Sequence, residues 1–88
     1  MKYSAFLKKV KLSNNIEIIP KNCFGNCTSL EKVILPTKLE TIEEYAFEKC
    51  TSLKSIVIPN GVKEIHDGAF CNCKNLKEIV IPSSMKKI

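Results

Sequence analysis

The feature that most constrains this chain is an internal repeat with a period of 23 residues. A period of about 20 to 50 residues is typical of solenoids, in which each repeat forms one coil and packs on its neighbours. No insertion or deletion interrupts the register. The matched columns are Phe24, Phe47 and Phe70; Cys27, Cys50 and Cys73; Leu30, Leu53 and Leu76; Val33, Ile56 and Ile79; Leu35, Ile58 and Ile81; Pro36, Pro59 and Pro82; Leu39, Val62 and Met85; and Ile42, Ile65 and Ile88.

The repeats predict a single domain over residues 1–88. Residues 19–41, 42–64 and 65–88 form three full repeats, and residues 1–18 form a partial, degenerate one. In the partial repeat, Ser4 and Ser13 stand where the later repeats have cysteine and proline. Because one repeat cannot bury its own apolar side, we expect all of them to share one core.

Each repeat contains a short apolar segment with the two-residue period of a β-strand. In the segment 53–59, Ile56 and Ile58 are expected to face inward, and Ser55 and Val57 outward. Pro59 removes a backbone donor and ends the strand. Stacking then places equivalent strands about 4.8 Å apart in a parallel sheet.

The rest of the repeat returns the chain on the opposite side. Asn60–Gly61 is a turn signal, and Val62 and Ile65 are expected to cover this side of the core. Ala46–Phe47 is predicted to form a short helical or 3₁₀ turn that fills the core. The sequence therefore predicts a right-handed solenoid. Its concave face carries a short parallel β-sheet, and its convex side carries short 3₁₀ or helical turns and extended segments.

The repeat motif resembles a known family. Residues 46–65 follow the pattern A-F-x-x-C-T-S-L-x-x-I-x-I-P-x-x-V-x-x-I, which closely resembles the BspA-like leucine-rich repeat. The match is full over residues 19–88 and partial over 4–18, and it departs at Cys23, where alanine is expected. The resemblance implies a leucine-rich repeat fold in a surface-associated or secreted protein that acts in adhesion or protein binding. It brings no catalytic motif.

Five cysteines suggest disulfide or metal chemistry, but their pattern favours neither. Cys27, Cys50 and Cys73 share one column, so neighbours could approach bridging distance, yet the total is odd. Recurrence at one core position favours reduced thiols that pack as small apolar side chains. Cys23 and Cys71 do not complete the paired spacing of a zinc site, so no metal site is expected. Cys71 is expected to be exposed.

The residue types required for catalysis do not form a set. His66 is the only histidine and shares a variable surface column with Glu43, so no serine or cysteine triad is expected. Phosphate-binding loops and paired-carboxylate motifs are absent from the sequence, which predicts neither an enzyme nor a cofactor. Residues 26–28 match a glycosylation sequon, but the placement of Cys27 in the core favours a chance match.

The charge and hydropathy patterns limit the classes of partner. The net charge is +5, and the lysines are spread along the chain, which favours a solvated surface over a nucleic-acid interface. Lys8, Lys9 and Lys11 form a basic N-terminal rim that would suit an acidic partner or a polyanion. No segment approaches the roughly 20 apolar residues of a membrane span. The first residues do not resemble a signal peptide, whereas the family resemblance implies the cell surface or secretion, so the compartment stays open.

The outward side chains of the predicted strands are the candidate partner-binding site. An apolar column with a charged rim is typical of a protein contact surface, although β-branched residues also suit any exposed strand. We therefore expect a non-enzymatic protein-interaction module that binds a protein partner. The candidate residues are Lys9, Lys11, Lys32, Ile34, Ser55, Val57, Glu78 and Val80.

The ends of the repeat array suggest an alternative function. Solenoids need polar caps, but the sequence ends at the inward position Ile88 and shows no cap at Met1. The alternative is an intracellular scaffold or assembly element that self-associates through open repeat ends as a homo-oligomer.

Overall fold

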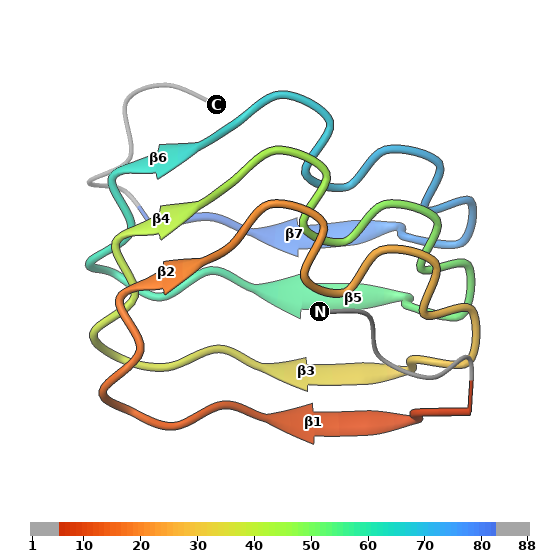
Figure 1. Ribbon diagram of the computed structural model, residues 1–88, viewed down its shortest axis with the longest axis horizontal. Helices are drawn as coiled ribbons and strands as arrows, with labels where there is room; N and C mark the ends of the chain where they lie inside the picture. Colours follow the sequence, from red (N-terminus) through yellow and green to blue (C-terminus); the bar gives the residue numbers. More distant parts are fainter. Residues whose placement is uncertain (1–5, 83–88) are drawn as a thin grey trace.

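The protein, described over residues 6–82 of a computed structural model, winds as flat coils stacked on one another (Figure 1). Each complete coil carries a three-residue strand on one side and a two-residue strand on the other. The longer strands are β1 (Lys9–Lys11), β3 (Lys32–Ile34), β5 (Ser55–Val57) and β7 (Glu78–Val80). The shorter strands are β2 (Ile18–Ile19), β4 (Thr41–Ile42) and β6 (Glu64–Ile65).

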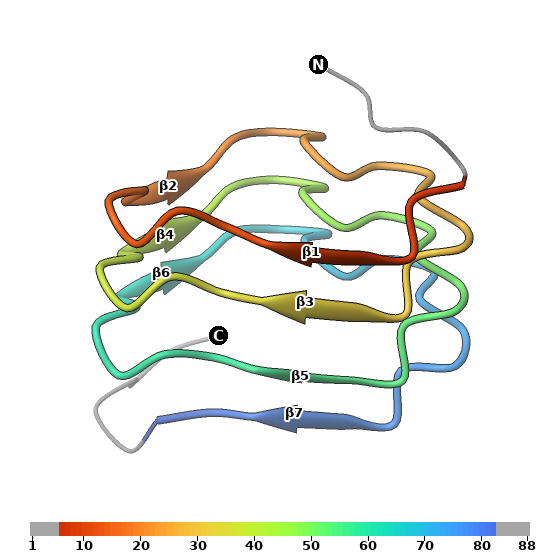
Figure 2. The ribbon, with the colours of Figure 1, turned by 90° about the horizontal axis from the view of Figure 1, so that it is seen from below.

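The strands pair in parallel with a register of one repeat, as the sequence predicts. Lys9 lies opposite Lys32 where β1 pairs with β3, and Ser55 lies opposite Glu78 where β5 pairs with β7. The longer strands form one row in two views, although their ladder pairing is divided into these two pairs (Figures 1 and 2). The period thus places equivalent backbone positions side by side.

The extended segments on the opposite side form a second parallel ladder, which the sequence did not reveal. Its order is β2-β4-β6, with Ile19, Ile42 and Ile65 in register. Two residues per strand are too few for an alternating pattern to be recognised. Their backbone groups nevertheless pair because the stacking brings them within hydrogen-bonding distance.

The core lies between the two ladders and consists of the predicted columns. Phe47 stacks between Phe24 and Phe70, with ring centroids 5.2 and 5.4 Å apart and nearly parallel planes. Leu30 and Leu53 are fully buried, and Leu76 is half-buried against the same core. Equivalent side chains from successive coils therefore pile up inside the molecule.

Residues 6–82 contain no helix, so the predicted helical or 3₁₀ turn around Ala46–Phe47 is not confirmed. The segment consists of separate hydrogen-bonded turns: the N–H of Ala46 donates to the Glu43 carbonyl and that of Glu48 to the Tyr45 carbonyl, each at 3.2 Å. A helix cannot run through this segment because left-handed residues interrupt it. Positive φ angles occur at Asn22, Tyr45 and Gly68 in one column and at Asn26, Lys49 and Asn72 in another.

Some sequence-based assignments stay predictions. Ser4, Met85 and Ile88 lie outside the described residues. The right-handed sense of the winding and the division into a partial repeat (1–18) and full repeats (19–41, 42–64 and 65–88) are interpretations of the sequence.

Candidate protein-interaction surface

The candidate site is the outward side of the four longer strands, here called the strand face. In β3 and β5 the central residues Val33 and Ile56 are buried, and the residues on either side of each are exposed. The strand geometry therefore directs the flanking side chains away from the core. The strand face comprises Lys9, Lys11, Lys32, Ile34, Ser55, Val57, Glu78 and Val80, as predicted from the sequence.

An apolar row crosses the strand face. Ile34, Val57 and Val80 expose 45, 63 and 46% of their surface. The register places Val57 beside Val80, and Lys11 beside Ile34, so the row ends in a lysine at β1. Three exposed β-branched residues in one column form a continuous apolar strip instead of scattered single residues.

The β1–β3 half of the strand face is strongly basic. Lys9 and Lys32 lie directly opposite each other in the ladder, an arrangement that like charges disfavour. None of the strand-face lysines makes an ion pair within residues 6–82, where the ion pairs are Lys21–Glu44 at 3.6 Å and His66–Glu64 at 3.1 Å. Their charge is therefore available to a partner.

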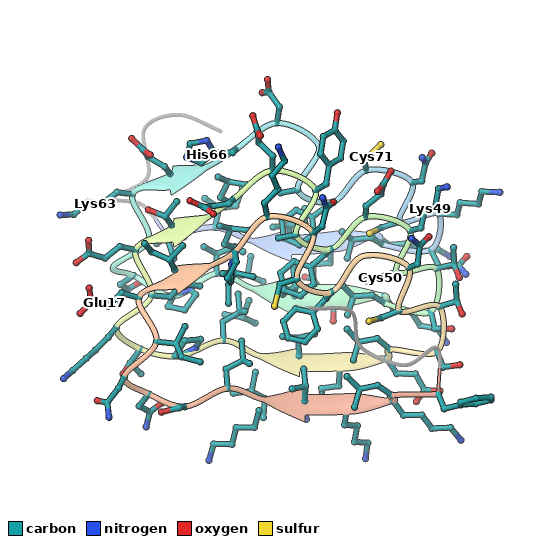
Figure 3. The ribbon with its side chains drawn as sticks, in the orientation of Figure 1. Glu17, Lys49, Cys50, Lys63, His66 and Cys71 are labelled. Carbon is teal, nitrogen blue, oxygen red and sulfur yellow. The ribbon has the colours of Figure 1, made fainter. Side chains whose placement is uncertain are left out.

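The opposite side of the molecule, here called the back face, is acidic. It comprises the outward residues of β2, β4 and β6 and the segments beside them. Glu17, Lys63 and His66 lie on this side (Figure 3). Residues 17–22, 40–45 and 63–68 contain Glu17, Glu40, Glu43, Glu44, Glu64 and Asp67 against Lys21 and Lys63. Two pairs of these carboxylates recur at the repeat period, Glu17 with Glu40 and Glu44 with Asp67. This recurrence was the signal that strand-by-strand reasoning missed.

The cysteine column runs through the interior, and all of the cysteines carry free thiols. The Cys50 thiol donates to the Phe24 carbonyl at 3.3 Å, and the Cys73 thiol donates to the Phe47 carbonyl at 3.0 Å. Hydrogen bonding with Cys73, together with burial, raises the pKa of Cys50. The same contact lowers the pKa of Cys73 to about 7.

The remaining thiols differ in their exposure. Burial raises the pKa of both Cys23 and Cys27, and Cys27 is completely buried. Cys71, which the sequence predicted to be exposed, is half-buried. No group of three or more histidine, cysteine or acidic side chains in the described part of the chain is arranged to hold a metal ion.

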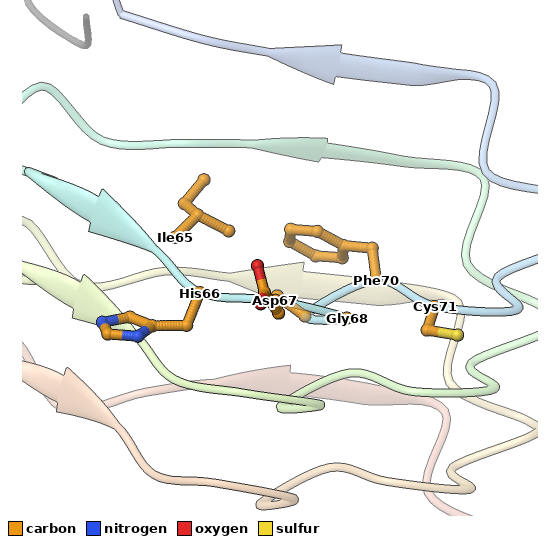
Figure 4. Close-up of a pocket in the computed structure, with 7 residues that line it drawn as sticks. Ile65, His66, Asp67, Gly68, Phe70 and Cys71 are labelled. Atoms are coloured by element: carbon orange, nitrogen blue, oxygen red, sulfur yellow. The ribbon is translucent and has the colours of Figure 1, made fainter. Parts of the chain in front are cut away.

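A shallow depression of about 340 Å³ lies beside β6, lined by residues 65–71 (Figure 4). Ile65 and Phe70 lie on one side of this segment and His66 on the other. His66 is exposed, as predicted, and its Nε2 lies 3.1 Å from Oε1 of Glu64. This surface pair brings together no nucleophile and base.

Stacked short coils, parallel pairing at one repeat and a columnar core define the chain as a repeat solenoid. The family model for the BspA-type leucine-rich repeat region matches residues 2–88 with six copies. The chain belongs to this family.

A crystal structure supports the same fold. A leucine-rich repeat protein from Bacteroides ovatus superimposes with a TM-score of 0.82 at 27% sequence identity, over 97% of this chain and 26% of that protein. The chain thus spans about a quarter of the length of this neighbour. A comparison with curated proteins gave no significant match. Within residues 6–82, no helix has the length and apolar character needed to cross a membrane.

Proposed function

We propose that this chain is a non-enzymatic protein-interaction module that binds a protein partner across the strand face. The observation that carries the proposal is the exposed row of Ile34, Val57 and Val80, which the fold aligns beside a charged rim. An apolar centre with a polar rim is the usual anatomy of a protein interface. The family's repeats generally mediate protein interactions, which supports this use of the fold.

We further propose that the partner is met at the cell surface or outside the cell, in an adhesive role. This part of the proposal rests on the resemblance to the BspA-like family.

Site-specific photo-crosslinking tests the proposed face. A photo-reactive amino acid placed at Val57 should crosslink the chain to discrete surface proteins of the source organism. The matched control carries the same group at Ile18 of β2, which is also exposed (49%) but lies on the back face. Crosslinking from Ile18 alone, or from neither position, contradicts the proposal.

A second candidate function is an assembly element, and the exposure of apolar side chains in and beside β7 favours it. Ile79 and Ile81 are 38 and 36% exposed, whereas their counterparts Ile56 and Ile58 are both 2% exposed. Stacking of a second copy against β7 would bury them. Sedimentation velocity should then show a mass that rises with concentration and returns to that of a monomer in Ile79→Lys. A concentration-independent monomer contradicts this function.

A further inference from the structure

We propose that the partner segment is bipartite: its carboxylate side chains lie over β1 and β3, and its apolar side chains lie over β5 and β7. This inference rests on the proposed function and adds the chemistry and the orientation of the partner. The strand face is not uniform, because its charge changes from one end of the ladder to the other.

The basic half is built by register. Lys9 and Lys32 are direct neighbours, Lys11 lies beside Ile34, and all of them are exposed. Lys8, just before β1, adds a further exposed cation, and Glu31 holds the equivalent position one repeat later, where its N–H donates to the Lys8 carbonyl at 2.7 Å. Ladder neighbours of like charge repel, so a carboxylate bound between them would remove an unfavourable interaction.

The other half offers apolar contact. Ser55 lies beside Glu78, and Val57 lies beside Val80 as the continuation of the apolar row. The two valines have stiff β-branched side chains, which lose little conformational entropy when a partner covers them. An acidic side chain at this end would meet Glu78. The two halves therefore favour different parts of the partner and fix its direction along the ladder.

The back face strengthens this selectivity. It carries Glu17, Glu40 and Glu64 on or beside its strands, so an acidic segment is attracted to one side of the molecule and repelled from the other. Such an asymmetric field steers an oppositely charged partner and raises its association rate at low salt. The occupant that fits is an acidic and apolar protein segment.

Selection from a displayed library of random peptides tests the proposal with a defined probe. We expect the enriched peptides to carry aspartate or glutamate together with aliphatic residues. Lys32→Glu should weaken their binding about tenfold or more and reduce its dependence on salt. Because Lys32→Glu also creates an opposite-charge pair with Lys9, the fold should persist, as circular dichroism would show. Lys63→Glu on the back face is the matched control and should leave binding unchanged.

Val57→Ser should also weaken binding, whereas Ile18→Ser on the back face should not. Enriched peptides without an acidic bias that still respond to Val57→Ser would overturn the bipartite partner and leave the proposed function standing. Peptides insensitive to every strand-face change, or no enrichment at all, would overturn both. Binding of heparin or single-stranded DNA that responds to Lys32→Glu but not to Val57→Ser would show a polyanion site and overturn the proposal.

Discussion

At the scale of single residues, the aromatic column predicts that the contribution of a side chain to stability depends on its position in the stack. Phe47 is fully buried between Phe24 and Phe70, whereas Phe70 is only half-buried. Phe47→Ala should lower the free energy of unfolding by about 3–5 kcal/mol, since it leaves a cavity and removes two ring contacts. Phe70→Ala should cost clearly less. Urea denaturation measures both, and equal losses would contradict a column packed in this way.

The Cys50–Cys73 contact predicts selective thiol chemistry. The thiolate is the reactive form, and the pKa of Cys73 is lowered to about 7 while that of Cys50 is raised. Alkylation of Cys73 by iodoacetamide should therefore rise between about pH 6 and pH 8, with its midpoint near the pKa of about 7. Cys50 should stay unmodified in the folded protein. Peptide mass spectrometry follows each site, and a midpoint near the ordinary value of about 9 would contradict the prediction.

Single positions were the most predictable level of this structure. Because equivalent residues recur in register, inward Ile56 and outward Val57 could be assigned from alternation and repetition together. The left-handed residues were missed: Asn22, Asn26 and Asn72 carry the signal, since asparagine tolerates this conformation. Tyr45 and Lys49 obscure the signal because neither residue type favours a positive φ.

At the scale of elements, the turns offer a direct test of what a left-handed conformation costs a residue other than glycine or asparagine. Lys49 has a φ of 60° in a column where Asn26 and Asn72 adopt the same conformation. Lys49→Asn should raise the free energy of unfolding by about 0.5–1 kcal/mol, because asparagine enters the left-handed region at lower cost. Urea denaturation provides the measurement. Lys74→Asn, at an exposed position without a positive φ, is the control and should have little effect.

The two ladders differed in how far the sequence could predict them. The strands of the strand face have three residues, and a proline follows them in most repeats. Both the alternating pattern and the proline that ends the strand therefore made them predictable. The second ladder has two residues per strand, and its pairing arises from stacking more than from local preference. The same stacking places Glu17, Glu40 and the carboxylates near β6 on the back face. Their common face became evident only when this ladder was seen to form.

At the scale of the whole molecule, a solenoid is stabilised by each repeat and by its contacts with the neighbours on either side. The candidate site shares this property, because no single strand carries the strip of Ile34, Val57 and Val80. The sequence could predict which residues face outward. The contrast between a basic strand face and an acidic back face required both ladders in three dimensions.

Hydrogen exchange should reveal the same dependence on neighbours. The N–H of Phe47 donates to the Ala69 carbonyl at 2.7 Å within a coil that is covered on both sides. The N–H of Lys77, the residue before β7, donates to the Lys54 carbonyl at 3.0 Å. All three residues of β7 are exposed. Local opening near β7 exposes less buried apolar surface, so Lys77 should exchange at least about tenfold faster than Phe47 after correction for intrinsic rates. Nuclear magnetic resonance resolves the two amides. Equal protection would mean that the coils unfold only as one cooperative block, whereas greater protection at Lys77 would contradict stabilisation by neighbouring coils.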